Sequence, residues 1–111
     1  MDSCDLLCLD LDAAEAVRAA LDRDSAAVLA AAARTLADPT RLLVLQALAH
    51  RELCGCDLGW IVGQSDKVIS HHLARLRRDG LIASRREGRI VFASLTELGR
   101  SQLSALERLV A

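Results

Sequence analysis

The sequence has few aromatic residues and no long apolar run, and each shortage excludes a class of protein. Trp60 and Phe92 are the only Trp, Tyr or Phe residues among 111, which disfavours a β-sandwich and leaves little surface for stacking single-stranded nucleic acid. No apolar run approaches the roughly 18 residues of a membrane span. The N-terminus carries acidic residues where a secretory signal carries basic ones. We therefore expect a cytoplasmic protein with no membrane partner.

The residues that are present favour one mainly helical domain. Hydrophobic residues make up 52% of the sequence and charged residues 26%, as in globular domains, and alanine and leucine dominate. A chain of this length holds one core. Apolar periodicity, the Asp38-Pro39 break and the capping residue Ser65 predict helices over 13–22, over 25–37, from Pro39, over 53–62 and from Ser65 to Gly80.

After Gly80 the pattern changes from helical to extended. Residues 81–85 and 89–95 flank a short turn at 86–88 and predict a β-hairpin, and a last amphipathic helix follows Thr96. This order of helices, hairpin and closing helix is that of a winged helix-turn-helix fold. We therefore predict a mainly α fold with a β-hairpin wing.

Charge is distributed unevenly along the chain, although the formal net charge is only −1. Residues 1–33 hold seven acidic and two basic residues, whereas residues 67–100 hold eight basic and three acidic ones. A basic C-terminal half suits the phosphate backbone of double-stranded DNA. A solvated helix face is the alternative that charge alone leaves open.

The helix predicted after Ser65 has the pattern of a DNA-reading helix. Ile69, Leu73 and Leu76 share one face with His72, which we expect to be packed and hydrogen-bonded. Polar side chains on the other faces are predicted to meet the major groove, and the hairpin arginines the adjacent phosphates. The candidate DNA-binding residues are Lys67, Ser70, His71, Arg75, Arg85, Arg86 and Arg89. Adjacent histidines point about 100° apart on a helix, so His71 and His72 are not expected to hold one metal ion.

Four cysteines occur as two pairs, Cys4-x-x-x-Cys8 and Cys54-x-Cys56. Structural disulfides are rare in the cytosol, so metal binding or thiol chemistry is the better explanation, with four inert buried cysteines as the alternative. The thiols of Cys54 and Cys56 converge only if their segment is extended or just entering a helix. Thiolates favour soft or borderline ions, so Cd(II), Pb(II) and Zn(II) fit, with As(III) and Bi(III) as alternatives.

Four motifs in order make the sequence resemble one family. They are Ala37-Asp38-Pro39-Thr40-Arg41, Glu52-Leu53-Cys54-Gly55-Cys56-Asp57-Leu58, Ile69-Ser70-His71-His72-Leu73 and Glu87-Gly88-Arg89. Together they are similar to the ArsR/SmtB family of metal-responsive transcriptional repressors, over roughly residues 25–110. The Cys-x-Cys pair, with a cysteine-bearing N-terminal arm (residues 1–12) before the DNA-binding and dimerisation domain (residues 13–111), resembles the cadmium- and lead-sensing CadC-like branch.

The resemblance implies a homodimeric repressor that binds a two-fold operator in its metal-free form and dissociates when Cd(II), Pb(II) or Zn(II) binds. It implies a site formed by Cys54 and Cys56 of one subunit with Cys4 and Cys8 of the other. Many relatives carry a second, zinc-regulatory site on the last helix. No histidine follows Thr96, so we expect that second site to be absent here. The first and last helices are expected to form the dimer interface.

Two other functions fit parts of the same sequence. A thiol redox or persulfide sensor would keep the DNA-binding fold but join Cys4 or Cys8 to Cys54 or Cys56. Metal titration in excess reductant separates the two kinds of sensor, since a redox switch would then be silent. An enzyme with a cysteine nucleophile is not expected, because no Gly-rich loop or evident acid–base partner accompanies Cys54.

Overall fold

A computed structural model describes residues 10–111, so Cys4 and Cys8 of the expected arm lie outside the described residues. The chain divides into two compact units after Ala30, within the helix α2 (Arg23–Leu36). The sequence-based division between residues 12 and 13 remains a prediction. Among the described residues, no helix is both long and apolar enough to cross a bilayer.

The first unit contains α1 (Leu11–Ala20) and the beginning of α2. The Asp10 carboxylate accepts a backbone N–H of the first turn of α1 at 3.0 Å, and Asp22 accepts the N–H groups of Asp24 and Ser25 at 3.0 and 3.2 Å. Both predicted helices are confirmed, but each starts two residues earlier than expected. Asp22, rather than the Asp24-Ser25 pair, caps α2. All α1 residues are exposed, apolar ones included.

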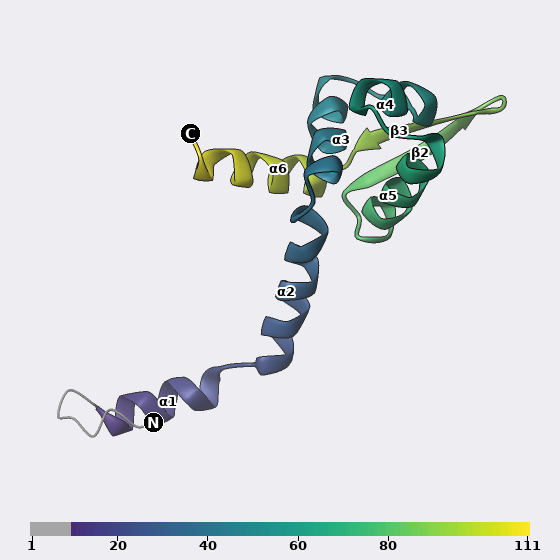
Figure 1. Cartoon of the computed structure of the whole chain (residues 1–111). Helices are drawn as coiled ribbons and strands as arrows, with labels where there is room; N and C mark the ends of the chain where they lie inside the picture. The colour runs from purple at the N-terminus through teal and green to yellow at the C-terminus, as the bar shows by residue number, and fades with distance from the viewer. Residues whose placement is uncertain (1–9) are drawn as a thin grey trace. The chain divides into compact units, whose positions relative to one another are not determined.

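The second unit carries the predicted winged helix-turn-helix (Figure 1). After the end of α2 its elements are α3 (Pro39–His50), β1 (Leu53–Cys54), α4 (Gly55–Val62), α5 (Asp66–Arg78), β2 (Ile82–Glu87), β3 (Ile90–Leu95) and α6 (Glu97–Leu109). The mainly helical fold class with a β-hairpin wing is therefore confirmed. The starts of α3 and α5 also follow prediction, since Asp38 and Ser65 cap them through their side-chain oxygens.

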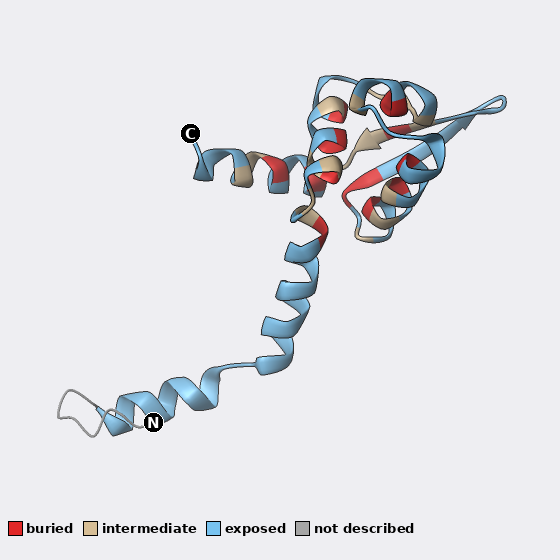
Figure 2. Ribbon diagram, viewed as in Figure 1, coloured by how far each residue is buried: buried red, intermediate tan, exposed pale blue. Residues whose placement is uncertain are grey.

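The core of this unit lies where α3, α4, α5, α6 and the base of the hairpin meet (Figure 2). Burial of each of its leucine and isoleucine side chains contributes about 1.5–3 kcal/mol to stability. Its members are Val44, Leu45, Leu48, Leu58, Ile69, Leu73, Leu76, Leu81, Ile82, Ala93 and Leu103. The predicted apolar face of α5 is thus confirmed, because Ile69, Leu73 and Leu76 all lie in this core.

The turn between α4 and α5 depends on two glycines. Gly63 ends α4 with φ +79°, a left-handed conformation that side chains rarely adopt. Gly59 lies under the turn, where a Cβ atom would come 2.9 Å from the carbonyl oxygen of Gln64. Because neither glycine has a side chain, α5 can begin close to α4 after the turn.

The hairpin and the segment before α4 differ from prediction. Arg86 pairs with Val91 and Glu87 with Ile90, so the expected turn at 86–88 is wrong, and the connection is the two-residue Gly88-Arg89. Gly88 has φ +63°, which suits the first position of a tight hairpin turn.

The second difference lies at Leu53, where a helix was expected to begin. Leu53 and Cys54 instead form a short strand opposite Ala93 and Phe92, which gives a three-stranded antiparallel sheet of order β1-β3-β2. Pairing with β3 holds these two residues extended, and the helix starts only at Gly55.

Candidate nucleic-acid interface and thiol site

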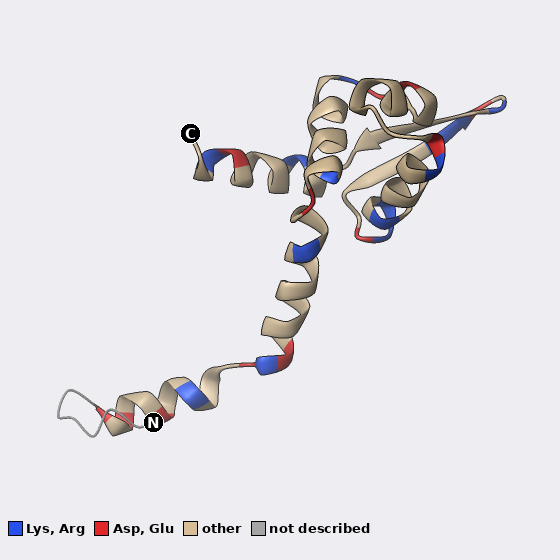
Figure 3. Ribbon diagram, viewed as in Figure 1, with Lys and Arg blue, Asp and Glu red and all other residues tan. Residues whose placement is uncertain are grey.

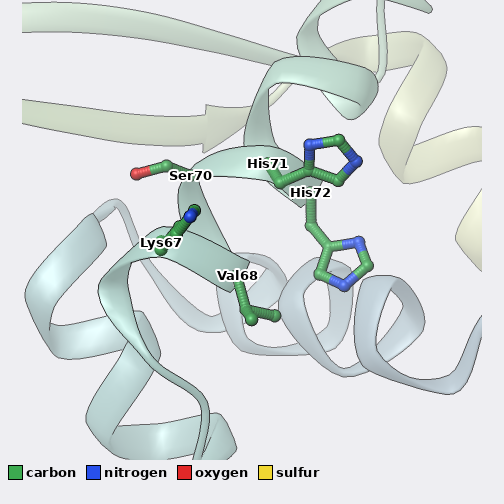
Figure 4. Close-up of a pocket in the computed structure, with 5 residues that line it drawn as sticks. All are labelled: Lys67, Val68, Ser70, His71 and His72. Atoms are coloured by element: carbon green, nitrogen blue, oxygen red, sulfur yellow. The ribbon is translucent and has the colours of Figure 1, made fainter.

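The N-terminal half of α5 presents polar side chains to solvent beside a hollow in the surface. Lys67, Ser70 and His71 are exposed and line this hollow together with Val68 and His72. In Figure 4, Val68 and His72 extend to one side of the helix and Ser70 extends away from them. The structure thus brings together three of the predicted DNA-binding residues on the side of α5 that the core does not use.

His72 belongs to a polar cluster that fixes α5 against its neighbours. Its Nδ1 lies 3.3 Å from Nη1 of Arg41, which is only 9% exposed. Arg41 also donates from Nε to the Thr35 carbonyl oxygen at 2.6 Å and from Nη2 to the Arg34 carbonyl oxygen at 3.2 Å. The prediction that His72 is packed and hydrogen-bonded is confirmed, whereas His71 stays exposed.

Arg75 points toward this same cluster. Its Nε donates to the Thr35 hydroxyl oxygen at 3.1 Å, and that hydroxyl in turn donates to the Asp79 carboxylate. Arg75 is half-buried, unlike Lys67 and Ser70. Contact of Arg75 with DNA remains a prediction. Thr35 and Arg41 were not among the predicted site residues, and the signal in the sequence is a threonine near the end of an alanine-rich helix.

The three hairpin arginines have different surroundings. Arg85 donates to both carboxylate oxygens of Glu52 at 2.7–2.9 Å and to Glu87 at 2.7 Å, and its guanidinium lies 4.6 Å from the Phe92 ring centre. The hydrogen bonds to Glu52, and then those to Glu87, raise the pKa of Arg85 above its ordinary value. Within residues 10–111, Arg86 and Arg89 are exposed and form no ion pair.

Basic residues therefore gather on two elements of the second unit. Figure 3 shows Lys and Arg on α5 and along the wing toward its turn. Arg86 and Arg89 present charge that no carboxylate of the described residues neutralises. Such exposed positive charge can contact phosphates, whereas the Arg85 guanidinium is already paired with Glu52 and Glu87 of the same chain.

Cys54 and Cys56 lie at the junction of β1 and α4. Cys54 is half-buried and has extended backbone angles (φ −85°, ψ 165°), Cys56 is exposed in the first turn of α4, and both are free thiols. The segment is thus extended at Cys54 and enters a helix at Gly55, which meets the stated condition for the two thiols to converge. The two cysteines line a hollow of about 520 Å³ together with Gly55, Asp66, Ser70, Arg89, Ile90 and Val91.

This pair can supply two thiolates to a metal ion. Soft sulfur donors on either side of a glycine suit soft or borderline ions. Among residues 10–111, no three His, Cys, Asp or Glu side chains gather closely enough to hold an ion. A complete site therefore needs ligands beyond Cys54 and Cys56, and the candidates from the sequence, Cys4 and Cys8, lie outside the described residues.

Comparison with known proteins identifies the family. The family model described as "Bacterial regulatory protein, arsR family" matches residues 38–84, from the N-cap of α3 into β2. The cadmium resistance transcriptional regulatory protein CadC of Listeria innocua is 30% identical over 90 residues, which cover 80% of this chain and 76% of that protein. The chain belongs to the arsR family. The ArsR/SmtB resemblance and the similarity to CadC proteins are thus confirmed.

Two further comparisons agree with this arsR-family assignment. The transcriptional repressor SmtB homolog of Synechocystis is 43% identical over 74 residues, which cover 67% of this chain and 56% of that protein. The homodimeric winged helix-turn-helix DNA-binding domain Mb0332 of Mycobacterium bovis superposes with a TM-score of 0.72 at 25% identity, over 81% of this chain and 86% of that structure. Members of the family are transcriptional regulators, so the prediction of a regulator and not an enzyme is confirmed.

Proposed function

We propose that this arsR-family protein is a homodimeric repressor that binds a two-fold operator without metal and releases it when a soft metal ion binds Cys54 and Cys56. One observation carries the proposal. The two thiols lie in the same hollow as Ser70 of α5 and Arg89 of the wing turn, so the metal site adjoins both elements expected to touch DNA. Binding at the thiols can therefore alter the DNA-binding surface.

DNA binding in this proposal uses α5 and the wing for different tasks. Lys67, Ser70 and His71 are exposed near the N-terminus of α5 and suit contacts to base edges in the major groove. Arg86 and Arg89 suit the adjacent phosphates, which position the protein without reading sequence. Arg75 and Arg85, also predicted to bind DNA, have partners within the fold, so we propose that they position α5 and the wing.

The proposed inducer site uses Cys54 and Cys56 of one subunit with Cys4 and Cys8 of its partner. Four thiolates suit Cd(II), and Pb(II) and Zn(II) are the other ions that this donor set favours. The name of the CadC relative, a cadmium resistance regulator, supports cadmium. As(III) and Bi(III) are alternatives for the same thiolates, to be separated by titration.

Apolar side chains on α1 and α6 support a homodimer. Leu11 and Val17 of α1 are 62% and 59% exposed, and Leu109 and Val110 at the end of α6 are 78% and 87% exposed. Within one chain these side chains gain little from burial, so a second copy that covers them would stabilise both. The Mycobacterium bovis neighbour is itself homodimeric.

An operator-release titration tests the inducer site. The probe is a duplex selected in vitro for binding by the metal-free protein, and Cd(II), Pb(II) or Zn(II) is added in excess reductant. Cys54→Ser and Cys56→Ser should keep the metal-free affinity and lose release by each ion. Release by these variants at wild-type metal concentrations would refute the thiolate sensor. If metal does not release DNA from the wild type in excess reductant but an oxidant does, the redox alternative is favoured.

The salt dependence of DNA binding tests the wing. Arg86→Ala should weaken binding to every duplex and lower the slope of log affinity against log salt by about one phosphate contact. Arg51→Ala, between α3 and β1, is a matched loss of one exposed charge outside α5, the hairpin and the helices α1 and α6 of the proposed dimer interface. Equal slopes for Arg86→Ala and wild type would refute the assignment of the wing to phosphates.

A further inference from the structure

We infer that Val68 reads DNA sequence, by packing its methyl groups against the C5-methyl group of a thymine in each half of the operator. The inference rests on the proposed function and deepens it, because it names a base that α5 recognises. Val68 is absent from the DNA-binding residues predicted from the sequence, all of which are polar or charged. Three observations carry the inference: the position of Val68 on α5, its exposure, and the fixed direction of its side chain.

Val68 lies at the edge of the side of α5 that is proposed to face DNA. A helix turns by about 100° per residue, so Val68 lies about 60° from His71 and about 100° from the buried Ile69. It lines a hollow of about 510 Å³ together with Lys67, Ser70 and His71, the residues proposed to contact base edges. A base pair held by these polar side chains therefore comes within reach of the valine.

Val68 is an apolar side chain on an otherwise polar surface. It is 36% exposed, whereas the adjacent Ile69 is 1% exposed and belongs to the core. Valine has no hydrogen-bond donor or acceptor in its side chain, so it cannot read a base edge as its polar neighbours do. The C5-methyl group of thymine is the apolar group that base edges present in the major groove. The exposed valine therefore matches thymine and no other base.

The direction of the Val68 side chain is fixed. Its backbone N–H donates to the hydroxyl oxygen of the capping Ser65 at 3.2 Å, and a β-branched side chain has one strongly preferred rotamer in a helix. His72 follows one turn later on the same side of α5 (Figure 4), and its Nδ1 lies 3.3 Å from Nη1 of Arg41. The methyl groups are thus held in place before DNA binds, so a contact with thymine costs little conformational entropy.

A double-mutant cycle between protein and DNA tests the inference. Each thymine of a half-site in the selected duplex is replaced, together with its symmetry mate, by deoxyuridine, which lacks only the methyl group. Dissociation constants are measured for the metal-free, full-length protein. In the wild type, replacement at one position should weaken binding about fourfold for each methyl group removed, the effect of one buried methylene. In Val68→Ala the same replacement should weaken binding less than about twofold, because the partner of the thymine methyl is gone.

Two variants control for other effects on DNA binding. Val68→Ile keeps a branched apolar side chain and should keep the wild-type loss at the same thymine. Lys67→Ala removes a neighbouring charge, so it should weaken binding to both duplexes and leave their ratio as in the wild type. Because Val68 is exposed, Val68→Ala should melt at the wild-type temperature, which circular dichroism measures.

Three outcomes overturn this inference alone. They are a wild type whose affinity no replacement changes, a loss in Val68→Ala that equals the wild-type loss at every thymine, and a loss that disappears in Lys67→Ala as well. A metal-loaded wild type that keeps its duplex overturns the proposed function and leaves this inference standing. A wild type that selects no duplex overturns both.

Discussion

The Nε atom of Arg75 donates a hydrogen bond to the Thr35 hydroxyl oxygen at 3.1 Å, which ties the DNA-reading helix to the last turn of α2. The same hydroxyl donates to Asp79, at the C-terminal end of α5. Thr35 is 1% exposed, so the threonine end of both hydrogen bonds is shielded from solvent. The orientation of α5 therefore depends on a threonine 40 residues earlier in the chain.

The first prediction concerns this contact. Thr35→Val keeps the side-chain shape but leaves Arg75 and Asp79 without their shared partner, and should lower the free energy of unfolding by about 1–3 kcal/mol in urea titrations. Arg75→Ala should also destabilise the fold while leaving the salt dependence of DNA binding as in the wild type. A fall of that slope by about one contact would instead show that Arg75 meets a phosphate.

The second prediction concerns the N-cap of α3. The Asp38 carboxylate accepts the Arg41 N–H at 3.0 Å, and this hydrogen bond, aided by the nearby Arg41 charge, lowers the pKa of Asp38 from 3.8. Asp38→Ala should reduce the free energy of unfolding by about 0.5–2 kcal/mol at pH 7, and Asp38→Asn, which keeps an acceptor, by less.

The pH dependence of the Asp38 variants follows from the direction of that shift. A carboxyl whose folded pKa is lowered stabilises the fold fully above its unfolded pKa, and the effect is lost as pH falls through the folded pKa. The stability gap between wild type and Asp38→Asn should therefore shrink below pH 3.8. If this difference in unfolding free energy stays constant until the protein unfolds in acid, the ionised Asp38 carboxylate does not stabilise the fold as proposed.

The third prediction separates the two faces of α5. Leu76 is fully buried, and Leu76→Ala should cost about 2–5 kcal/mol of stability. Ser70 is exposed, so Ser70→Ala should change stability by no more than about 0.5 kcal/mol and should reduce preference for the selected duplex over a scrambled one. Thermal melts measure stability and competition binding measures the preference for the selected duplex. If Ser70→Ala loses stability and Leu76→Ala loses only that preference, the faces of α5 are wrongly assigned.

The fourth prediction uses the single tryptophan as a reporter. Trp60 is 86% exposed and follows Cys56 by four residues on α4, so the two side chains are neighbours on one helix face. Metal binding at Cys56 should change Trp60 emission, with Pb(II), the heaviest of the three ions, quenching most. Cys56→Ser should lose this response, and a response that persists in that variant would place the ion elsewhere.

Much of the fold follows from local sequence. The helix start after the Asp38-Pro39 break, the cap at Ser65 and the buried stripe of Ile69, Leu73 and Leu76 were all predicted, because each depends on residues within one or two helical turns. The extended backbone at Leu53 and Cys54 was not predicted, because a helix was expected from Leu53 and the strand that replaces it depends on pairing with β3. Local chemistry thus determines the helix-turn-helix, whereas the geometry of the cysteine pair also depends on the pairing of Cys54 with Phe92 in β3.

Only the tertiary structure decided which charged side chains are available. Three hairpin arginines look equivalent in sequence, yet Arg85 is paired with Glu52, 33 residues away, whereas Arg86 and Arg89 have no such partner in the described chain. The hairpin register likewise moved the turn to Gly88-Arg89 and placed Arg89 beside the cysteines. These outcomes depend on contacts between distant segments, and no local pattern encodes which distant carboxylate or strand a side chain will meet.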